Sequence, residues 1–482
     1  MNNHFKNSFR KIIYATLLAA ALAAGFLSGC EFLGITVGEN SEEEKNDAQT
    51  SVQEVAEPVI VIEVKEDEPE ISIEEAEEEV EEPPVYEEIY DPVGKEYSVM
   101  TASPDEITLA FAGDVGFAEG YATINKYRSM GSDVGKSFDP EILDTMRNVD
   151  IMMVNNEFPY SYRGSPTPNK TYTFRADPAD VSILKDMGVD IVSLANNHAY
   201  DYGPDALIDT IDTLNDAKVP FVGAGKNIEE AKKPAYFHAN GHVISYVSAT
   251  QIERYANPDT REATEDSPGV LRTLDASSFI PTIEEAERNS DFTIVYVHWG
   301  SESTDLVEQS QRDLAKAYVD AGADLIIGDH SHCLQGIDYV DGVPVFFSLG
   351  NYWFNSRTLD TCIVRTTLDS ECKLKAVEFI PCLQTGSCVR SCDESSYERI
   401  LKYMRGISNY AEIDENGFVY ESSENYNTQN GQNTSPAKKT EKPAEEAAVP
   451  TDPAAIDPAA LELLTQQLLE QQAVQADPTA VQ

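Results

Sequence analysis

The sequence predicts an α/β domain, because short apolar runs rich in β-branched residues alternate with amphipathic helical stretches from Ile107 onward. Side chains that bind metals recur directly after the predicted strands. Segments of different composition flank this part, acidic before it and rich in Asn, Gln, Ser, Ala and Pro after it. We therefore expect one folded region of roughly 310 residues between two disordered segments.

The first thirty residues have the layout of a secretory signal peptide. Basic residues precede the apolar run from Ile12 to Phe26, which ends in Leu27-Ser28-Gly29-Cys30. That ending resembles the bacterial lipobox, in which the cysteine receives a diacylglyceryl group. A transmembrane helix is the alternative, but the run is shorter than the ~20 residues that a span needs. We expect residues 1–30 to be a lipoprotein signal peptide, with the protein exported and lipid-anchored through Cys30 on the outer face of the cell membrane.

The flanking segments have compositions that disfavour a packed core. Residues 31–104 are acid-rich, as in Glu74-Glu75-Ala76-Glu77-Glu78-Glu79, and the formal net charge of the chain is -49. Like charges repel and the apolar area is too small to offset the ordering entropy, so we expect an acidic disordered spacer. Residues 406–482 are expected to be a low-complexity, mostly disordered tail. The strongly negative charge also argues against nucleic acid as a partner.

The folded region, residues 105–405, contains the expected secondary structure. The buried strands are expected at Ile107–Ala112, Ile151–Asn155, Ile191–Leu194, Pro220–Gly223, Val243–Ser248, Phe292–His298, Leu325–Gly328 and Val345–Ser348. Helices with apolar residues three and four apart are expected at Pro178–Met187, Pro204–Ala217 and Leu306–Ala321. Two later runs, Cys362–Leu368 and Lys373–Ile380, are typical of antiparallel strands and would belong to a second sheet.

Six cysteines besides Cys30 lie late in the chain, at Cys333, Cys362, Cys372, Cys382, Cys388 and Cys392. An even number in an exported protein allows disulfides, but the many pairings leave none assigned. A zinc knuckle formed by Cys382, Cys388 and Cys392 is a weaker alternative, because it lacks the paired two-residue spacing of such sites.

Metal-binding side chains recur at the carboxyl ends of the predicted strands, the edge at which open α/β sheets bind ligands. The strand ends are Gly113-Asp114, Asn156-Glu157, Asn196-Asn197-His198, His298-Trp299-Gly300-Ser301-Glu302 and Gly328-Asp329-His330-Ser331-His332. Carboxylates, an amide carbonyl and imidazoles suit Zn, Mn or Fe better than copper. Each residue alone has a structural alternative, such as a turn or a hydrogen-bonded histidine. Their joint occurrence predicts a metal or catalytic site.

Two of these motifs are specific, Asn196-Asn197-His198-Ala199-Tyr200-Asp201-Tyr202-Gly203 and Ser348-Leu349-Gly350-Asn351. Together with the other strand ends, they resemble the CapA family of poly-gamma-glutamate capsule synthesis proteins, over about Glu106 to Phe354. That family is similar in fold to calcineurin-like metallophosphoesterases. The resemblance therefore implies a four-layer αββα, metallophosphatase-like sandwich in which two mixed sheets are flanked by helices.

The resemblance also implies a site for two divalent metals. Asp114 and His332 would hold one metal, with Glu157 as the bridging carboxylate. The phosphoesterases begin with Asp-x-His, whereas Gly116 stands in place of that histidine here, so this metal lacks one imidazole. The second metal would keep its full set of protein ligands: Asn197, His298 and His330. We therefore expect one metal to be held tightly and one weakly.

Further roles around the metals follow from the same resemblance. His198 stands where the phosphoesterases place the histidine that protonates a leaving group or stabilises the transition state. Asp201 and Glu302 are candidates for orienting the Asn197-His198 turn and His298. Asn351 either lines the crevice or forms a turn.

The resemblance implies a role in capsule polymer biosynthesis or export, and two functions fit. The first is a metal-dependent hydrolase acting on a phosphoester or a glutamyl bond. The second is a non-enzymatic accessory of a membrane polymer synthetase complex, in which the site binds metal or polymer carboxylates. The expected partners are membrane lipid through Cys30, that complex, and an anionic polymer or phosphorylated substrate. The substrate itself does not follow from fold resemblance.

Overall fold

The computed structural model describes residues 88–251 and 259–422. The predicted signal peptide, Cys30, most of the acidic spacer and the tail beyond residue 422 lie outside the described residues. Within the described ranges, no helix is both long enough and apolar enough to cross a lipid bilayer.

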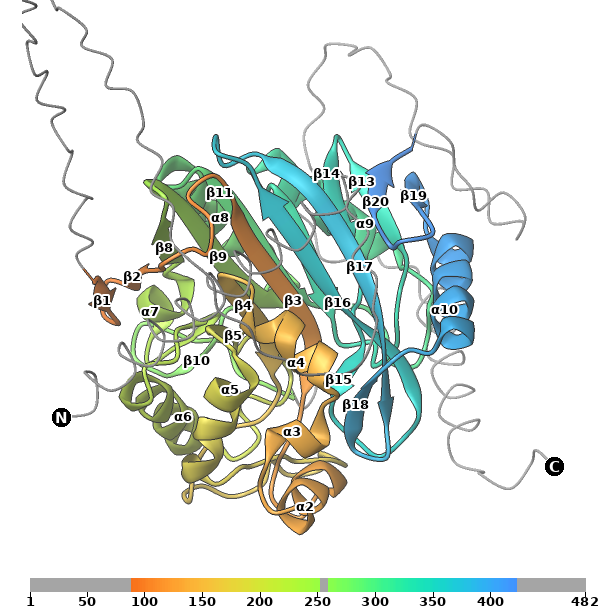
Figure 1. Ribbon diagram of the computed structural model, residues 1–482. Helices are drawn as coiled ribbons and strands as arrows, with labels where there is room; N and C mark the ends of the chain where they lie inside the picture. The colour runs from red at the N-terminus through yellow and green to blue at the C-terminus, as the bar shows by residue number, and fades with distance from the viewer. Residues whose placement is uncertain (1–87, 252–258, 423–482) are drawn as a thin grey trace, which may run out of the picture. The chain divides into compact units, whose positions relative to one another are not determined.

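Two eight-stranded mixed sheets form the centre of the described fold (Figure 1). The first sheet has the order β1-β2-β8-β9-β11-β12-β14-β13. Its strands β9, β11, β12 and β14 are parallel neighbours. In sheet order the bounds are Tyr90–Asp91, Glu96–Ser98, Ala235–Ala239, His242–Thr250, Phe292–His298, Leu325–Asp329, Val343–Phe346 and Ile337–Val340.

The second sheet has the order β18-β17-β16-β3-β4-β5-β6, with β15 also paired to β3. Strands β3 to β6 are parallel neighbours, whereas β16, β17 and β18 extend the sheet in antiparallel fashion. In sheet order, and ending with β15, the bounds are Cys388–Ser391, Leu374–Thr385, Leu359–Leu368, Ile107–Val115, Ile151–Asn156, Ile191–Ser193, Phe221–Val222 and Asn351–Trp353. The predicted antiparallel strands of a second sheet are thereby confirmed.

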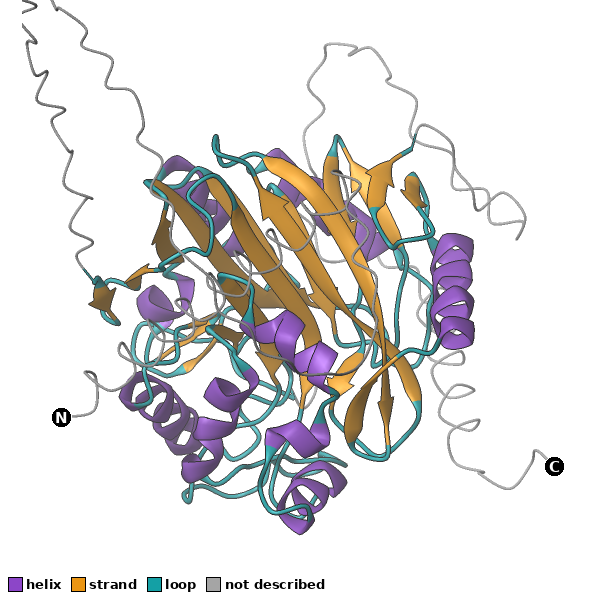
Figure 2. Cartoon of the chain, in the orientation of Figure 1, coloured by secondary structure: helices purple, strands orange, loops and turns teal. Residues whose placement is uncertain are grey.

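Helices lie against the outer faces of both sheets, over the parallel strands of each, as Figure 2 shows by colour. The helices are α2 Ala122–Ser129, α3 Val134–Ser137, α4 Pro140–Arg147, the 3-10 helix η2 Pro178–Val181, α5 Ser182–Met187, α6 Pro204–Asp216, α7 Ile228–Lys232, α8 Phe279–Arg288, α9 Gln309–Asp320 and α10 Glu394–Ile407. Two short antiparallel pairs complete the elements: β7 Ala224–Gly225 with β10 Gly269–Val270, and β19 Ala411–Ile413 with β20 Val419–Glu421.

The alternation of side chains along the strands divides the hydrophobic core into three layers. In β3, Leu109 points into the core between the two sheets, whereas Ala110 packs on the side of α4, α5 and α6. In β11, Ile294 points into the same central core, and Val295 packs on the side of α8 and α9. Three apolar interfaces separate four layers of secondary structure. The predicted αββα sandwich is therefore confirmed.

The folded part begins earlier and ends later than the sequence predicts. Strand β2 pairs in parallel with β8, and its Tyr97 is 4% exposed in the central core. The acidic composition before residue 105 conceals this strand. At the other end, α10 continues to Ile407, and the β19–β20 pair reaches Glu421 instead of ending at residue 405. The folded part therefore extends beyond residues 105 and 405 at both ends.

Candidate metal centre

The carboxyl ends of strands from both sheets meet at one place. Asp114 lies in β3 beside β4, where the parallel register pairs it with Asn155. His298 ends β11, and the register of the neighbouring β12 pairs it with Asp329. Strand β15 returns along β3 and pairs Asn351 with Asp114. The sheet edge predicted from the sequence thus brings together residues that are far apart along the chain.

The donor atoms form two clusters that share one carboxylate. Asp114, Glu157 and His332 offer ligand atoms within 4.8 Å of one another, and so do Glu157, His298 and His330. Both oxygens of Glu157 are buried and have no hydrogen-bond partner among the described residues. A buried carboxylate without a donor is costly, and a cation between these clusters would remove that cost. These buried groups could therefore hold a metal ion, and Glu157 belongs to both clusters.

The cluster around His298 is fully buried and closely supported. His298 Nε2 lies 2.9 Å from Asn197 Oδ1, 3.0 Å from His330 Nδ1 and 3.7 Å from Glu157 Oε1. Its other nitrogen, Nδ1, lies 2.7 Å from Asp329 Oδ1. A carboxylate on Nδ1 fixes the tautomer and leaves Nε2 to face the donor cluster. Asp329 also belongs to a third group of possible ligands, with Asp114 and His298. Its contact with His298 Nδ1 indicates that it orients this ring.

The cluster around Asp114 is more open. His332 Nδ1 lies 3.2 Å from Asp114 Oδ2 and 2.8 Å from Asn351 Oδ1. Asn155 Nδ2 donates to Asp114 Oδ1 at 2.9 Å. The His332 side chain is 20% exposed, whereas that of His298 is 0% exposed. Asn351 thus contacts a predicted ligand and also lines the pocket in front of it.

Burial and neighbouring charges set the protonation of these groups. Burial, followed by the charges of Asp114 and Asp329, raises the pKa of Glu157 well above its usual value. Burial also lowers the pKa of His298 to about 3 and that of His330 well below the usual value. Neutral imidazoles are the form that binds metals. His298 and His330 are therefore held neutral beside a carboxyl group that resists ionisation, whereas the hydrogen bond and charge of Asp114 raise the pKa of His332 against the effect of burial.

The backbone at the end of β12 is bent away from ordinary conformations. His330 has φ 94 and His332 has φ 56, both in the left-handed region that side-chain-bearing residues rarely occupy. Such strain persists where the surrounding structure fixes it, commonly at functional sites. Both imidazoles consequently reach the donor clusters although only Ser331 separates them.

His198 sits beside the clusters and is held from behind. Its Nδ1 lies 2.7 Å from Asp201 Oδ2, and its Nε2 lies 4.0 Å from Glu157 Oε1. The Phe174 ring packs on the imidazole with centroids 4.3 Å apart. Lys170 Nζ contacts both Asp201 Oδ1 and the Asn197 carbonyl oxygen. Asp201 therefore lies where the sequence predicts an orienting residue, with Lys170 as a second support.

A pocket of about 480 Å³ opens in front of His198 and His332. Its remaining lining comprises Gly116, Ala118, Tyr121, Tyr172, Phe174, Glu302, Ser303, Asn351, Phe354, Asn355 and Arg357. Glu302 lies in this lining, and no hydrogen bond or ion pair joins it to His298, whose contacts include Asn155, Asn197, Asp329 and His330. The expected orienting role of Glu302 toward His298 thus has no contact to support it, and Asp329 takes that place.

Asp329 and Lys170 have no role predicted from the sequence. Asp329 stands in the quoted Gly328-Asp329-His330 motif, and pairing the two parallel strands in register would have placed it beside His298. Lys170 lies in the loop between β4 and η2, and no motif marks it. The six late cysteines carry free thiols and belong to none of the metal-binding clusters found among the described residues.

Comparison with known proteins gives the family of the chain. Residues 108–356, just over half of the chain, match the family described as "Bacterial capsule synthesis protein PGA_cap". The "PGA biosynthesis protein CapA" of Bacillus subtilis (strain 168) is 33% identical over 272 residues, which are 55% of this chain and 69% of that protein. The "Capsule biosynthesis protein CapA" of Bacillus anthracis is 32% identical over 274 residues, 54% of this chain and 64% of that protein.

Among solved structures, a hypothetical protein from Thermus thermophilus is similar, with 15% identity and a TM-score of 0.35, over 58% of this chain and 100% of that one. The matched region spans every strand that contributes to the metal clusters, from β3 to β15. The chain is therefore a member of the CapA family of bacterial capsule synthesis proteins.

Proposed function

We propose that this chain acts in capsule polymer synthesis as a metal-dependent hydrolase, whose substrate is a phosphoester or a glutamyl bond. The arrangement of His198 carries the proposal. Asp201 occupies its Nδ1, its Nε2 faces Glu157, and the ring lines the pocket. With Nδ1–H donated to Asp201, Nε2 can take up a second proton, and the resulting imidazolium beside a cluster of metal-binding donors can give that proton to a leaving group.

The residues of the site would have different roles in this reaction. Asp114, Glu157, Asn197, His298, His330 and His332 would hold the divalent metals, which when bound polarise a phosphoryl or carbonyl oxygen. Asp201 and Lys170 hold His198 in place from the side opposite the pocket. Phe174 covers one face of the imidazole and excludes water from it. His198 Nε2 would then transfer its proton inside the pocket.

The proposal is tested with the purified full chain in Mn²⁺ or Zn²⁺. We expect turnover of a generic phosphodiester or of poly-gamma-glutamate, and we expect His198→Ala to reduce kcat about 100-fold or more, as loss of a general acid does. His238→Ala is the matched control, because His238 lies in β8 and pairs with Glu96 far from the clusters. Equal turnover by His198→Ala and wild type would contradict the proposal. Metal and polymer binding without any turnover would instead support a non-enzymatic accessory.

We also propose that Cys30 anchors the protein to the outer face of the membrane, a role that rests on the lipobox-like sequence alone. Cys30→Ser should then leave the membrane fraction or remain unprocessed. A variant that fractionates and migrates like the wild type would contradict this anchor.

A further inference from the structure

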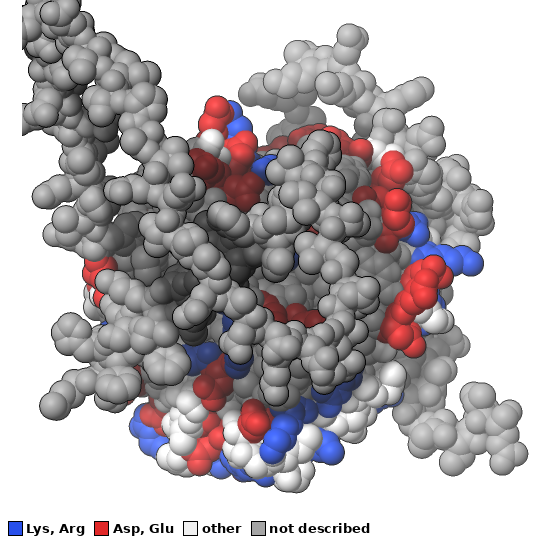
Figure 3. Space-filling view, in the orientation of Figure 1, with Lys and Arg blue, Asp and Glu red and all other residues white. Residues whose placement is uncertain are grey.

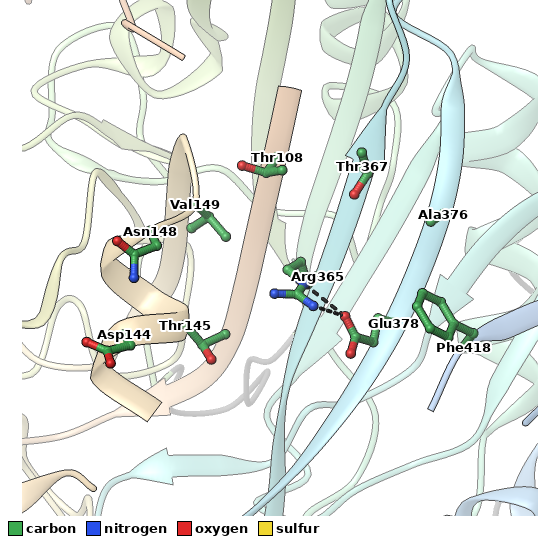
Figure 4. A pocket seen from close by; sticks show the side chains of 10 residues that line it. All are labelled: Thr108, Asp144, Thr145, Asn148, Val149, Arg365, Thr367, Ala376, Glu378 and Phe418. Carbon is green, nitrogen blue, oxygen red and sulfur yellow. Dashed lines mark hydrogen bonds and ion pairs between the residues drawn. The ribbon is translucent and has the colours of Figure 1, made fainter. Parts of the chain in front are cut away.

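Several basic side chains on the described surface are neutralised by acidic partners. On the face shown in Figure 3, basic and acidic side chains intermingle along the lower edge, the region of α2 in Figure 1. There Arg128 pairs with Glu119 and Asp180. A second cavity, of about 430 Å³, contains Arg365, which pairs with Glu378 across β16 and β17 (Figure 4). That pair neutralises the arginine, and the cavity contains none of the metal-binding clusters found in the described residues.

Arg357 is different. It is the single Lys or Arg in the lining of the pocket in front of His198 and His332, and its side chain is exposed. Within residues 88–251 and 259–422, its guanidinium makes no ion pair with a carboxylate. An arginine without a protein partner at the mouth of a reactive pocket is available to a ligand. Its planar fork of donors matches carboxylate and phosphate oxygens.

Hydrogen bonds from a buried glutamine hold the loop that carries Arg357. Gln384, in β17, is 0% exposed, and its Oε1 accepts from the backbone nitrogens of Phe354 at 2.7 Å and Asn355 at 3.0 Å. Its Nε2 donates to Asn355 Oδ1 at 2.9 Å and to the Arg357 carbonyl at 3.4 Å. Asn355 Oδ1 also accepts from the Arg357 backbone nitrogen at 2.9 Å. One buried amide thus ties down the turn from which the guanidinium projects.

We propose that Arg357 and the Gln384-anchored turn form an oxyanion-binding subsite at the mouth of the pocket. The subsite binds a carboxylate or phosphate of the substrate other than the group that reaches the metal clusters. It deepens the proposed function and rests on it for the reacting end of the ligand. Tyr172, which is 63% exposed, lies in the same lining.

Glu302 provides a control for the direction in which ligand affinity changes. It lies in the same pocket lining as Arg357 and bears the opposite charge. An anionic ligand that contacts Arg357 is therefore repelled by Glu302. Removing the two charges separately must change its affinity in opposite directions, which a merely structural role of either residue does not produce.

The test is calorimetric titration of the full chain in the presence of Mn²⁺. One probe is a short gamma-linked glutamate oligomer, and the parallel probe is a bisphosphate of a short diol; both carry an oxyanion besides the one that would reach the metal clusters. Arg357→Gln should weaken oligomer binding about tenfold, the size of a lost charged hydrogen bond. Arg357→Lys should recover part of the loss, and Glu302→Gln should tighten binding. Arg288→Gln, an exposed arginine at the end of α8, is the matched control and should bind like wild type. A loss confined to one of the two probes identifies the oxyanion as carboxylate or phosphate.

Binding separates this inference from the hydrolase proposal. If no substrate turns over but Arg357→Gln still weakens binding, the subsite stands and the hydrolase does not. If turnover occurs, Arg357→Gln should raise KM and leave kcat near wild type, because the contact lies away from the reacting group. Equal affinity of Arg357→Gln and wild type for both probes would overturn the subsite.

Discussion

The two metal-binding clusters share Glu157 but differ in how firmly the fold holds their other ligands. His298 and His330 are buried, and Asp329 fixes the His298 ring from behind. His332 is partly exposed, and its Nδ1 contacts Asp114, which is itself a predicted ligand, and Asn351. Ligands held in place before metal arrives lose less entropy on binding it. The cluster around His298 should therefore be the tighter of the two.

The space beside Gly116 is already filled, which accounts for the lack of a second imidazole in the cluster around Asp114. A β-carbon built at Gly116 would lie 2.6 Å from Phe354 Cδ2 and 2.7 Å from Cε2. The Phe354 ring also lies 5.1 Å, between centroids, from the His332 ring. An aromatic side chain thus fills the volume in which the phosphoesterase pattern places a histidine. The difference between the clusters lies in packing as well as in ligand count.

Removing one histidine from each cluster should give the largest effect. His298→Ala removes a buried ligand and should abolish the metal that wild type retains after dialysis, whereas His332→Ala should leave that metal in place. Loss of a direct ligand should exceed the about 10–100-fold weakening that follows loss of an orienting partner. Metal analysis of dialysed protein measures this. Two tightly retained equivalents in wild type, or a retained metal that His298→Ala does not reduce, would refute the asymmetry.

Changing Asp329, which contacts His298 Nδ1, should have the next largest effect on metal affinity. Asp329→Asn keeps the shape but removes the charge on Nδ1, so the retained metal should bind about 10–100-fold more weakly. Asp324→Asn is the matched control, since Asp324 precedes the same strand at its other end and accepts from the Thr293 backbone nitrogen at 2.8 Å. Competition with a chelator gives both affinities. Equal weakening by the two variants would show a general effect on β12 instead of a specific contact.

The sequence predicts the site better than it predicts the boundaries of the fold. Parallel strands buried on both faces give clear apolar runs, and the polar residues after them stand out, so Asp114 and His298 can be found from the pattern. Strand β2 cannot, because its Glu96-Tyr97-Ser98 sequence lacks an apolar run and its pairing with β8 is non-local. Helix α8 is also missing from the predicted elements, although Pro281 lies in its first turn, where proline is tolerated.

Contacts between distant segments account for what the sequence leaves open at the site. The role of Asp329 depends on the register of β12 against β11, and that of Lys170 depends on where a long loop folds back. Neither follows from local pattern. The packing of Phe354 on Gly116 is likewise set by the return of β15 along β3. Residue types can be read along the chain, whereas the partners of each residue require the fold.

The smallest expected effect comes from restoring an imidazole at position 116. The phosphoesterase pattern suggests that Gly116→His would raise occupancy of the weaker cluster if the backbone there accepts a side chain. A β-carbon at Gly116 overlaps the Phe354 ring unless that side chain moves, so we expect Gly116→His alone to add no retained metal and to lower stability by about 1–3 kcal/mol, the usual cost of overpacking.

Opening the space should change that result. The double variant Gly116→His, Phe354→Ala removes the overlapping ring and leaves room for the new imidazole, so it should retain more metal in the cluster around Asp114 than Phe354→Ala alone. Metal analysis after dialysis, together with the free energy of unfolding of all three variants, compares ligand number with packing directly. Suppose that Gly116→His alone gains a retained metal at Asp114 without losing stability. Metal affinity of the weaker cluster is then limited by the number of ligands and not by the Phe354 ring.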